Sequence, residues 1–395
     1  MADSFKYIII GRGMMGAAAA RHLAAETDGV ALIGPDEPQD AARHEGVFAS
    51  HYDEARITRT IDPNPVWALL AKRSIARYGE IAAASGIDFF HPAGCLMVGP
   101  RRGGRDPYVA DICMAAERVG ADVELIDDRR LAERFPYFSF ASGCEGVFEA
   151  AGAGYVNPRR LVEAQSVLAR RAGATLIPET VVSTRESGNG VLVRTAEGRE
   201  VRGDKVLVAT GGFSIAENLL PKPVDLSVYA RTVAFFEIPE SERLHYAGMP
   251  SLIHHPDDPH DHIYLLPPVR YPDGTTYLKI GGDPDDLRLQ TEPDVRAWFR
   301  SGGRAGTRDH LKRIIDTLVP SLASAPLSMG ACVTSFTPGN YPAIGFAGER
   351  TAVLTGGCGA AAKSSDEIGR LGASLLLGKG LDEDAYGAVF APVFR

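Results

Sequence analysis

The sequence predicts a mixed α/β (α+β) chain in which a Rossmann-like domain is combined with a discontinuous second domain built on an antiparallel sheet. Three observations carry this prediction. First, a strand, a glycine-rich turn and an alanine-rich helix open the chain at YIIIGRGMMGAAAARHLAA, residues 7–25. Second, strands with alternating apolar and polar residues begin near residue 221. Third, a strand–turn–helix pattern returns near residue 352. At 395 residues the chain exceeds the usual size of a single hydrophobic core, so two domains are expected.

The opening turn has the spacing GxGxxG, formed by Gly11, Gly13 and Gly16. In a nucleotide-binding turn the first glycine allows the sharp bend, the second lets the backbone approach a pyrophosphate, and the third lets the helix pack on the strand. The phosphates then lie at the positive end of the helix dipole. Arg12, inside the turn, reaches either a phosphate or only solvent.

The next strand, residues 30–33, ends at Gly34, where such folds usually place an acid that binds a ribose. Asp36 is the nearest substitute, although an acid in a polar turn is more often merely solvated. A helix-like segment then carries Arg56 and Arg59 on one face, which alone would indicate a solvated basic surface. Residues 64–86 read as one amphipathic helix.

Later elements follow in order. The pattern predicts a helix from about residue 158 to 173, a strand, a β-ribbon over 181–201, strands at 204–212, 229–238, 261–269 and 275–282, helices within 292–318, a strand into a glycine turn, and a helix from about Lys363. We therefore assign residues 1–90, 151–220 and 338–395 to the nucleotide-binding domain, and residues 91–150 and 221–337 to a substrate domain.

Composition excludes several classes of protein. The net charge of −8 argues against nucleic-acid binding, and no apolar run is long enough for a signal-peptide core or a membrane span, so we expect a cytoplasmic protein. The five cysteines form no CxxC pair. HHPDDPHDH, residues 254–262, gathers metal-binding residue types, but its prolines break helical ligand spacing. We expect a polar loop without a metal, with His262 as a candidate for the cavity entrance.

The C-terminal segment makes the interpretation specific. GACVTSFTPGNYPAIGFAGERTAVLTGGCGAAAKSSDEIGRLGASLLLGKG places Cys332 before TPxxxPxIG and follows it with a strand, a GGxGxxxK turn and a helix. It resembles the D-amino-acid-oxidase-like FAD-dependent oxidoreductases, and most closely the monomeric sarcosine oxidase branch. The resemblance extends along nearly the whole chain, including SH…RxxR from Ser50 to Arg59, ATGG and LKIGG, and it implies that the bound nucleotide is FAD.

The resemblance also implies which residues contact FAD. Gly11, Gly13 and Gly16 would hold the pyrophosphate. The remaining matched positions are Ser50, His51, Arg56, Val182, Gly359, Ala360, Ala361, Ala362 and Lys363, of which Val182 would lie at the adenine through its backbone. Cys332 stands where sarcosine oxidases attach the flavin through a thioether, and the alternative is a small buried side chain beside a non-covalent FAD.

Three cations match catalytic positions of the family. Arg59 and Lys363 match the pair that clamps the substrate carboxylate, and Lys279 matches the lysine at which such oxidases activate dioxygen. Together these charges would lower the pKa of a bound ammonium, so no dedicated base would be needed.

The expected pocket walls depart from the sarcosine pattern at Tyr52, Leu265, Asp283 and Thr334. Asp283 would either favour a substrate with a remote cation, pair with Lys279 or face solvent, and we favour the last two.

The expected activity is oxidation of an amino or imino acid to an imine, which water hydrolyses to a 2-oxo acid or an aldehyde plus an amine, with hydrogen peroxide formed from dioxygen. Two alternatives remain. One is a 2-hydroxy-acid dehydrogenase of the same fold that passes electrons to another acceptor, and the other is a flavin-binding subunit of a larger complex. The substrate's identity and chirality and the oligomeric state are left open.

Overall fold

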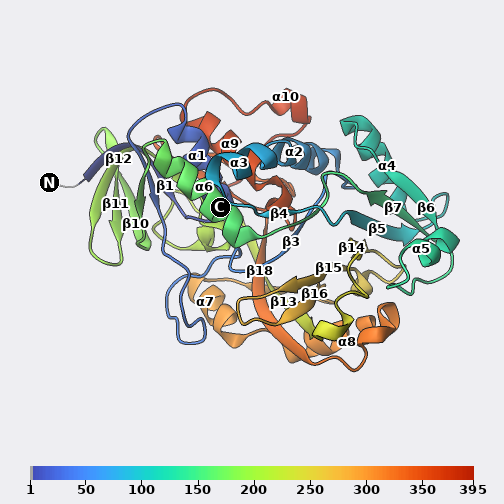
Figure 1. Ribbon diagram of the computed structural model, residues 1–395. Coiled ribbons are helices and arrows are strands. Elements are labelled where there is room, and N and C mark those ends of the chain that lie inside the picture. The colour runs from blue at the N-terminus through green and yellow to red at the C-terminus, as the bar shows by residue number, and fades with distance from the viewer. Residues whose placement is uncertain (1–2) are drawn as a thin grey trace.

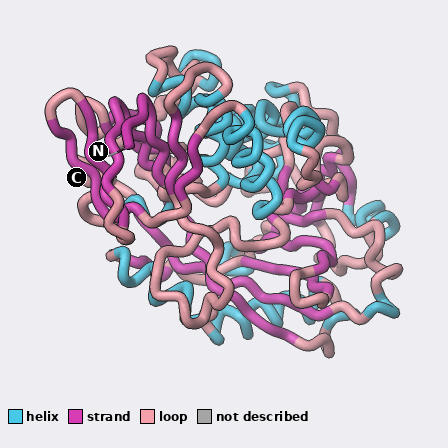
Figure 2. Tube along the Cα trace, turned by 60° about the vertical axis from the view of Figure 1, so that its left-hand side comes forward, coloured by secondary structure: helices cyan, strands magenta, loops and turns pink. Residues whose placement is uncertain are grey.

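The computed structural model describes residues 3–395, which form three sheets (Figures 1 and 2). The first sheet contains β1 (Asp3–Ile10), β2 (Val30–Ile33), β9 (Thr175–Ile177), β10 (Val181–Ser187), β11 (Gly190–Thr195), β12 (Glu200–Val208), β19 (Ala343–Phe346) and β20 (Thr351–Thr355). The second contains β5 (Cys95–Pro100), β6 (Glu124–Asp127), β7 (Cys144–Glu149), β13 (Ser227–Glu237), β14 (Ser251–His254), β15 (Ile263–Arg270), β16 (Thr276–Gly281), β17 (Leu287–Leu289) and β18 (Leu327–Phe336). A small third sheet joins β3 (Arg56–Thr58), β4 (Phe90–His91) and β8 (Gly154–Val156).

The helices cover these sheets. They are α1 (Met14–Ala24), α2 (Pro65–Ile75), α3 (Tyr78–Ser85), α4 (Tyr108–Val119), α5 (Asp128–Arg134), α6 (Pro158–Arg171), α7 (Glu292–Ser301), α8 (Ala305–Leu318), α9 (Ala361–Leu376) and α10 (Glu383–Tyr386). Short 3₁₀ turns lie at Gly211–Ile215, Glu240–Glu242, Pro259–Asp261 and Pro320–Leu322.

The first sheet has a parallel centre. β9, β2, β1, β12 and β20 run parallel in that order, while β10–β11 and β19 are antiparallel additions. Ile9 packs in one core and its neighbours Ile8 and Ile10 in another, because successive side chains of a strand point to opposite faces. α1, α6 and α9 lie together on this sheet (Figure 1). A side chain at Gly369 would meet the Met15 carbonyl at 2.8 Å, so this glycine permits the close packing of α9 on α1.

The second sheet is mostly antiparallel and is closed by α8 on its outer side. Its longest pairing, β13 with β18, runs from Ser227 opposite Phe336 to Phe236 opposite Leu327. Phe236, Leu278 and Ile315 belong to its core. The predicted mixed fold, with its Rossmann-like and antiparallel parts, is confirmed, whereas the domain boundaries stay a prediction.

Two local predictions are wrong. Residues 64–86 form two helices, which are separated at Ala76 and Arg77; the Arg77 guanidinium donates to Glu367 at 2.6 Å. Arg56 begins strand β3, not a helix, since Ile57 and Thr58 are β-branched and pair with β8. The last long helix, expected from about Lys363, begins at Ala361.

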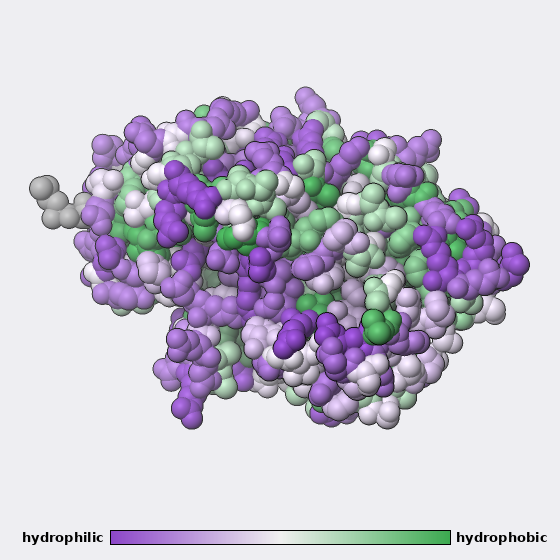
Figure 3. All heavy atoms as spheres, viewed as in Figure 1, coloured by the Kyte–Doolittle hydropathy of each residue, from purple (hydrophilic) through white to green (hydrophobic). Residues whose placement is uncertain are grey.

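Hydrophilic residues cover most of the face in Figure 3, and hydrophobic ones occur there in small groups. Within residues 3–395, no helix combines the length and apolar character that a membrane crossing requires.

Candidate functional site

A cavity of about 1150 Å³ lies between the two large sheets. On one side it is lined by residues at the carboxyl ends of β1, β2 and β12, including Ile10, Ile33 and Ala209. Strands of the second sheet line the other side, through residues such as Tyr264 and Thr334. Ligands of open α/β sheets bind at the carboxyl ends of the strands. The volume exceeds the roughly 300–1,000 Å³ of a pocket for one drug-sized molecule, so it accommodates a dinucleotide and a second small molecule.

The glycine turn forms one end of this cavity. Gly11 has a φ of +106°, and a side chain there would meet the Ala209 carbonyl at 2.4 Å. A side chain on Gly16 would lie 1.9 Å from the Gly11 carbonyl, whereas one on Gly13 would meet only His51 Nδ1, at 3.9 Å. Gly13 is also the N-cap of α1 and provides no side-chain cap, so the first amide groups of the helix remain available to an anion.

His51 provides a second polar group at this end. Its Nδ1 is buried and has no hydrogen-bond partner among the described residues. Burial, reinforced by Arg12, Arg159 and Arg56, lowers the pKa of His51 to about 3, so the ring is neutral. A buried ring nitrogen without a partner is costly, and a ligand group beside Gly13 would satisfy it.

The second sheet and the start of α9 form the other walls. Gly357 to Ala362 line the cavity, with Gly359 at a φ of +76°. Cys332 lines it from β18, where its Sγ accepts a hydrogen bond from Arg56 Nη2 at 3.4 Å and its carbonyl accepts one from Trp298 at 2.8 Å. The thiol is therefore held at the cavity wall beside a cation.

A group of charged side chains lies at the deep part of the cavity. Arg59 lines the wall, and its Nη2 is 3.2 Å from Asp62 Oδ2. The same carboxylate oxygen is 3.0 Å from Lys363 Nζ, which also donates to the Trp67 carbonyl at 3.2 Å. Burial lowers the pKa of Lys363 to about 8, although Asp62 acts in the opposite direction.

Lys279 is buried behind the wall, with 1% of its side chain exposed. Its Nζ lies 2.6 Å from Asp53 Oδ2 and also donates to the Ala55 carbonyl. Tyr271 donates to the other oxygen of Asp53 at 2.7 Å. Burial, followed by the charge of Arg56, holds the pKa of Lys279 well below its usual value. Asp53 is shared between Lys279 and Arg56.

Residues 6–375 of this chain match the family model described as FAD dependent oxidoreductase (DAO). The chain belongs to this family. Monomeric sarcosine oxidase of Bacillus sp. (strain B-0618) is 27% identical over 247 residues, 61% of this chain and 60% of that protein. Monomeric sarcosine oxidase of Bacillus sp. (strain NS-129) is 25% identical over 348 residues, 86% of this chain and 84% of that one.

Solved structures agree on the fold. NikD, an unusual amino acid oxidase essential for nikkomycin biosynthesis, superposes on all of this chain and 98% of its own with a TM-score of 0.77 at 18% identity. The resemblance predicted from the sequence is confirmed, and this protein is an FAD-dependent oxidoreductase. The open space before Gly13, the uncapped start of α1 and the unpartnered His51 nitrogen fit the pyrophosphate of that cofactor.

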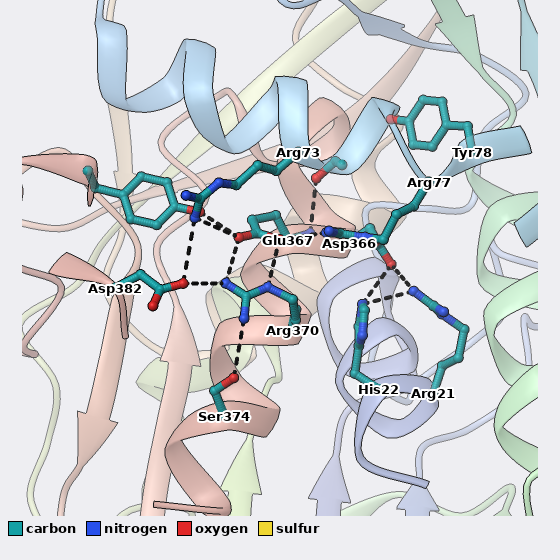
Figure 4. A network of polar contacts seen from close by, with 12 residues as sticks. Arg21, His22, Arg73, Arg77, Tyr78, Asp366, Glu367, Arg370, Ser374 and Asp382 are labelled. Carbon is teal, nitrogen blue, oxygen red and sulfur yellow. Dashed lines mark hydrogen bonds and ion pairs between the residues drawn. The ribbon is translucent and has the colours of Figure 1, made fainter. Parts of the chain in front are cut away.

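In this FAD-dependent oxidoreductase a buried ionic network holds the start of α9 in place (Figure 4). Asp366 accepts hydrogen bonds from Arg21 of α1 at 2.8 Å and from Gln165 of α6 at 2.8 Å. Its neighbour Glu367 accepts from Arg77 at 2.6 Å and from Tyr386 at 2.6 Å. The segment that carries Lys363 is therefore joined to α1, to α6 and to the turn before α3 by charge-assisted bonds.

The structure brings most of the predicted site residues to the cavity. Those lining it are Gly11, Gly13, Ser50, His51, Tyr52, Arg56, Arg59, Val182, Asp283, Cys332, Thr334, Gly359, Ala360, Ala361 and Ala362. Gly16 serves the packing of α1. Lys279 and Lys363 lie just behind the wall, each with 1% of its side chain exposed.

Several predictions need correction. Leu265 is fully buried in the core of the second sheet, because alternation along β15 turns its neighbour Tyr264 toward the cavity instead. Tyr52 lies at the nucleotide end, where its hydroxyl donates to the Asp36 carbonyl at 3.4 Å. Asp36 is exposed and pairs with Arg12. A side chain at Gly34 would meet the Arg12 amide at 2.6 Å, which explains why no acid follows β2.

Two electrostatic expectations are also wrong. Asp283 neither pairs with Lys279 nor faces solvent: it lines the cavity and accepts from the Thr232 amide at 3.2 Å, and burial raises its pKa to about 6. The cationic site is not uncompensated either, because Asp53 lies between Lys279 and Arg56, and Asp62 lies between the two clamp residues. Repulsion from bare cations therefore does not account for deprotonation of a bound ammonium.

Sequence reasoning missed an aromatic wall of the cavity. Tyr108 stacks on His255 and His255 on His262, each with ring centroids 4.0 Å apart. All three line the cavity, and the buried Tyr108 hydroxyl has no hydrogen-bond partner among the residues that the structure describes. His255 and His262 belong to the segment interpreted as a polar loop, in which only His262 was considered at the cavity entrance. The arrangement of these rings is not visible in the spacing of the histidines.

Proposed function

We propose that this enzyme oxidises the Cα–N bond of an amino or imino acid, a primary or secondary amine that carries a carboxylate. The observation that carries the proposal is Arg59: a guanidinium on the wall of a cavity that also contains the glycine turn, with a buried Nε that has no partner among residues 3–395. A carboxylate is the ligand that this edge of a guanidinium binds best. The sarcosine oxidases and NikD among the similar proteins support an amine as the oxidised group.

In this proposal Gly11, Gly13 and His51 hold the pyrophosphate of FAD and Val182 lies at its adenine. Gly359 to Ala362 lie along the flavin, where the uncapped start of α9 stabilises negative charge. When bound, FAD supplies the two-electron oxidation, and the chain's own residues bind and orient the substrate. Arg59 fixes the carboxylate, and the wall of Tyr108 and His255 excludes water and packs against the substrate side chain. The imine product is hydrolysed to a 2-oxo acid or an aldehyde plus an amine.

Dioxygen is the proposed electron acceptor, with hydrogen peroxide as its product and Lys279 as the cation nearest the site of its reduction.

One observation favours a second candidate. Because burial holds the pKa of Lys279 well below its usual value and Asp53 is its ion-pair partner, the structure offers less electrostatic stabilisation to a forming superoxide than a bare, charged lysine would. The second candidate is a dehydrogenase of the same fold that passes electrons from a 2-hydroxy acid or an amino acid to a different acceptor.

Turnover of Arg59→Met, measured beside Arg43→Met as a matched control, tests the proposal. The Arg43 side chain is 90% exposed. We expect kcat/KM for N-substituted amino acids to fall about 100-fold or more in Arg59→Met, since a charge partner of the substrate is lost, and to stay unchanged in the control. Equal kinetics in the two variants would remove Arg59 from the substrate site. Stoichiometric peroxide supports the oxidase, and turnover only with an artificial acceptor supports the second candidate.

A further inference from the structure

Asp62 occupies an unexpected place, between the two cations that the family resemblance assigns to the substrate carboxylate. Its Oδ2 is 3.2 Å from Arg59 Nη2 and 3.0 Å from Lys363 Nζ, and its Oδ1 accepts from the Asn64 amide at 2.9 Å. The side chain is 9% exposed and lines the cavity. Asp62 is thus an internal carboxylate that already pairs with both Arg59 and Lys363 when no ligand is bound.

Lys363 is turned toward this carboxylate. Its Nζ is shared between Asp62 and the Trp67 carbonyl. Among the described residues, the neighbouring Ala362 lines the cavity, whereas Lys363 does not. The Tyr78 hydroxyl donates to the Lys363 carbonyl at 3.4 Å, which holds the backbone as well. Lys363 therefore acts on a ligand in the cavity indirectly, because its charge is paired with Asp62.

Arg59 differs from Lys363, because one of its donors remains free. Nη2 is bonded to Asp62, whereas Nε is buried and lacks a partner within residues 3–395. A buried N–H that lacks an acceptor is destabilising, so this donor points to a ligand acceptor in the cavity. The ligand carboxylate and Asp62 would then bind the same guanidinium.

The charges of the cluster nearly cancel. Asp62 is joined by a second buried carboxyl, Glu149, which is 3% exposed and accepts from the Thr60 amide at 2.8 Å and the Ile61 amide at 3.1 Å. Two cations therefore face two buried carboxyls: Asp62, whose pKa Lys363 and Arg59 lower against the effect of burial, and Glu149, whose pKa burial raises. A ligand that brings only a negative charge is left poorly compensated in this buried place, but a zwitterion is not.

We propose that Asp62 determines the charge form of the substrate: by offsetting one of the two positive charges of the Arg59–Lys363 clamp, with Glu149 beside it, Asp62 makes the site select a carboxylate that carries a cationic nitrogen over an equally shaped plain carboxylate. This inference rests on the proposed function, since it concerns the same substrate site. Asp62 acts through Arg59 and Lys363, so it is a specificity-determining residue and not a catalytic one. The substrate therefore binds as a zwitterion.

Two ligands of matched shape test the proposal. Glycine betaine and 3,3-dimethylbutanoate both carry a carboxylate next to a methylene and a trimethylated centre, but only the former carries a positive charge. Dissociation constants are measured on the holoenzyme from the change in flavin absorbance. We expect wild type to bind betaine about tenfold or more tightly than dimethylbutanoate, and Asp62→Asn to bind dimethylbutanoate about tenfold or more tightly than wild type does.

Weaker or unchanged binding of dimethylbutanoate to a folded Asp62→Asn would overturn the inference, and so would a wild type that prefers dimethylbutanoate. The wild-type comparison needs no variant, so it decides the matter even where Asp62→Asn fails to fold. Failure of the proposed function is recognised separately, because then no amino acid bleaches the flavin of wild-type enzyme without oxygen. Bleaching by amino acids together with a reversed ligand preference would refute Asp62 alone.

Discussion

Replacing Glu367 with Gln should destabilise the protein at neutral pH but much less in acid. The Glu367 side chain is fully buried and accepts from Arg77 at 2.6 Å, from Arg370 at 2.8 and 2.9 Å, and from Tyr386 at 2.6 Å (Figure 4). Burial alone would raise its pKa, but the hydrogen bond from Arg370, together with those partners, lowers it from 4.5 to about 2.

The sign and the size of the effect follow from this shift. A carboxyl whose pKa is lower in the folded than in the unfolded state stabilises the folded protein above its unfolded pKa, and that contribution is lost as pH falls from about 4.5 through about 2. The difference corresponds to about 3 kcal/mol at neutral pH. The amide also leaves Arg73, Arg77 and Arg370 facing a neutral group, which adds to the loss.

Thermal unfolding of the holoenzyme between pH 7 and pH 3 measures the effect. Glu80→Gln, at an exposed position of α3, is the matched control. We expect Glu367→Gln to melt well below wild type at pH 7, with the gap closing toward pH 3, and the control to follow wild type throughout. A gap that stays constant with pH would refute the assignment of an ionised, network-bound Glu367.

Other predictions follow from individual contacts. Acid precipitation of wild type should leave yellow colour in the pellet if Cys332 is bonded to FAD, and Cys332→Ala should then release it; colour in the wild-type supernatant makes Cys332 a packing residue. His51→Leu should weaken FAD binding about tenfold in reconstitution titrations, because a buried hydrogen-bonding group is lost, and unchanged affinity would exclude its contact with the cofactor. Lys279→Met should slow re-oxidation of the reduced enzyme by air without slowing its anaerobic reduction; equal rates would remove Lys279 from the dioxygen reaction. Gly16→Ala should abolish FAD binding or folding, since its new methyl would lie 1.9 Å from the Gly11 carbonyl.

The parts of the fold that the sequence predicted correctly depend on local pattern. The run Tyr7–Ile10 and the glycines at 11, 13 and 16 define a strand, a turn and a helix through backbone geometry alone, and these elements are present. The single helix expected over residues 64–86 failed for the opposite reason. At the break, Arg77 binds carboxylates nearly 290 residues away, and no local pattern contains such partners.

The candidate site shows the same division. The family resemblance led to Arg59, Cys332 and the turn at Gly359, all of which line the cavity. The ion-pair partners of Lys279 and Lys363 could not be predicted from the sequence. Asp53 and Asp62 are acids in a polar stretch, and only the folded chain brings Lys279 and Lys363 against them. The error at Leu265 is a shift of one residue in a strand, which exchanges the cavity face for the core face.

Anaerobic titration of the purified holoenzyme tests the central claim most directly. The flavin absorbance is followed while matched pairs are added, each consisting of an N-methyl amino acid and the 2-hydroxy acid with the same side chain. The account predicts that members of the amino acid series bleach the flavin, that their hydroxy counterparts do not, and that air restores the colour with formation of peroxide. Bleaching by the hydroxy acids alone, or a purified protein that binds no flavin, would contradict it.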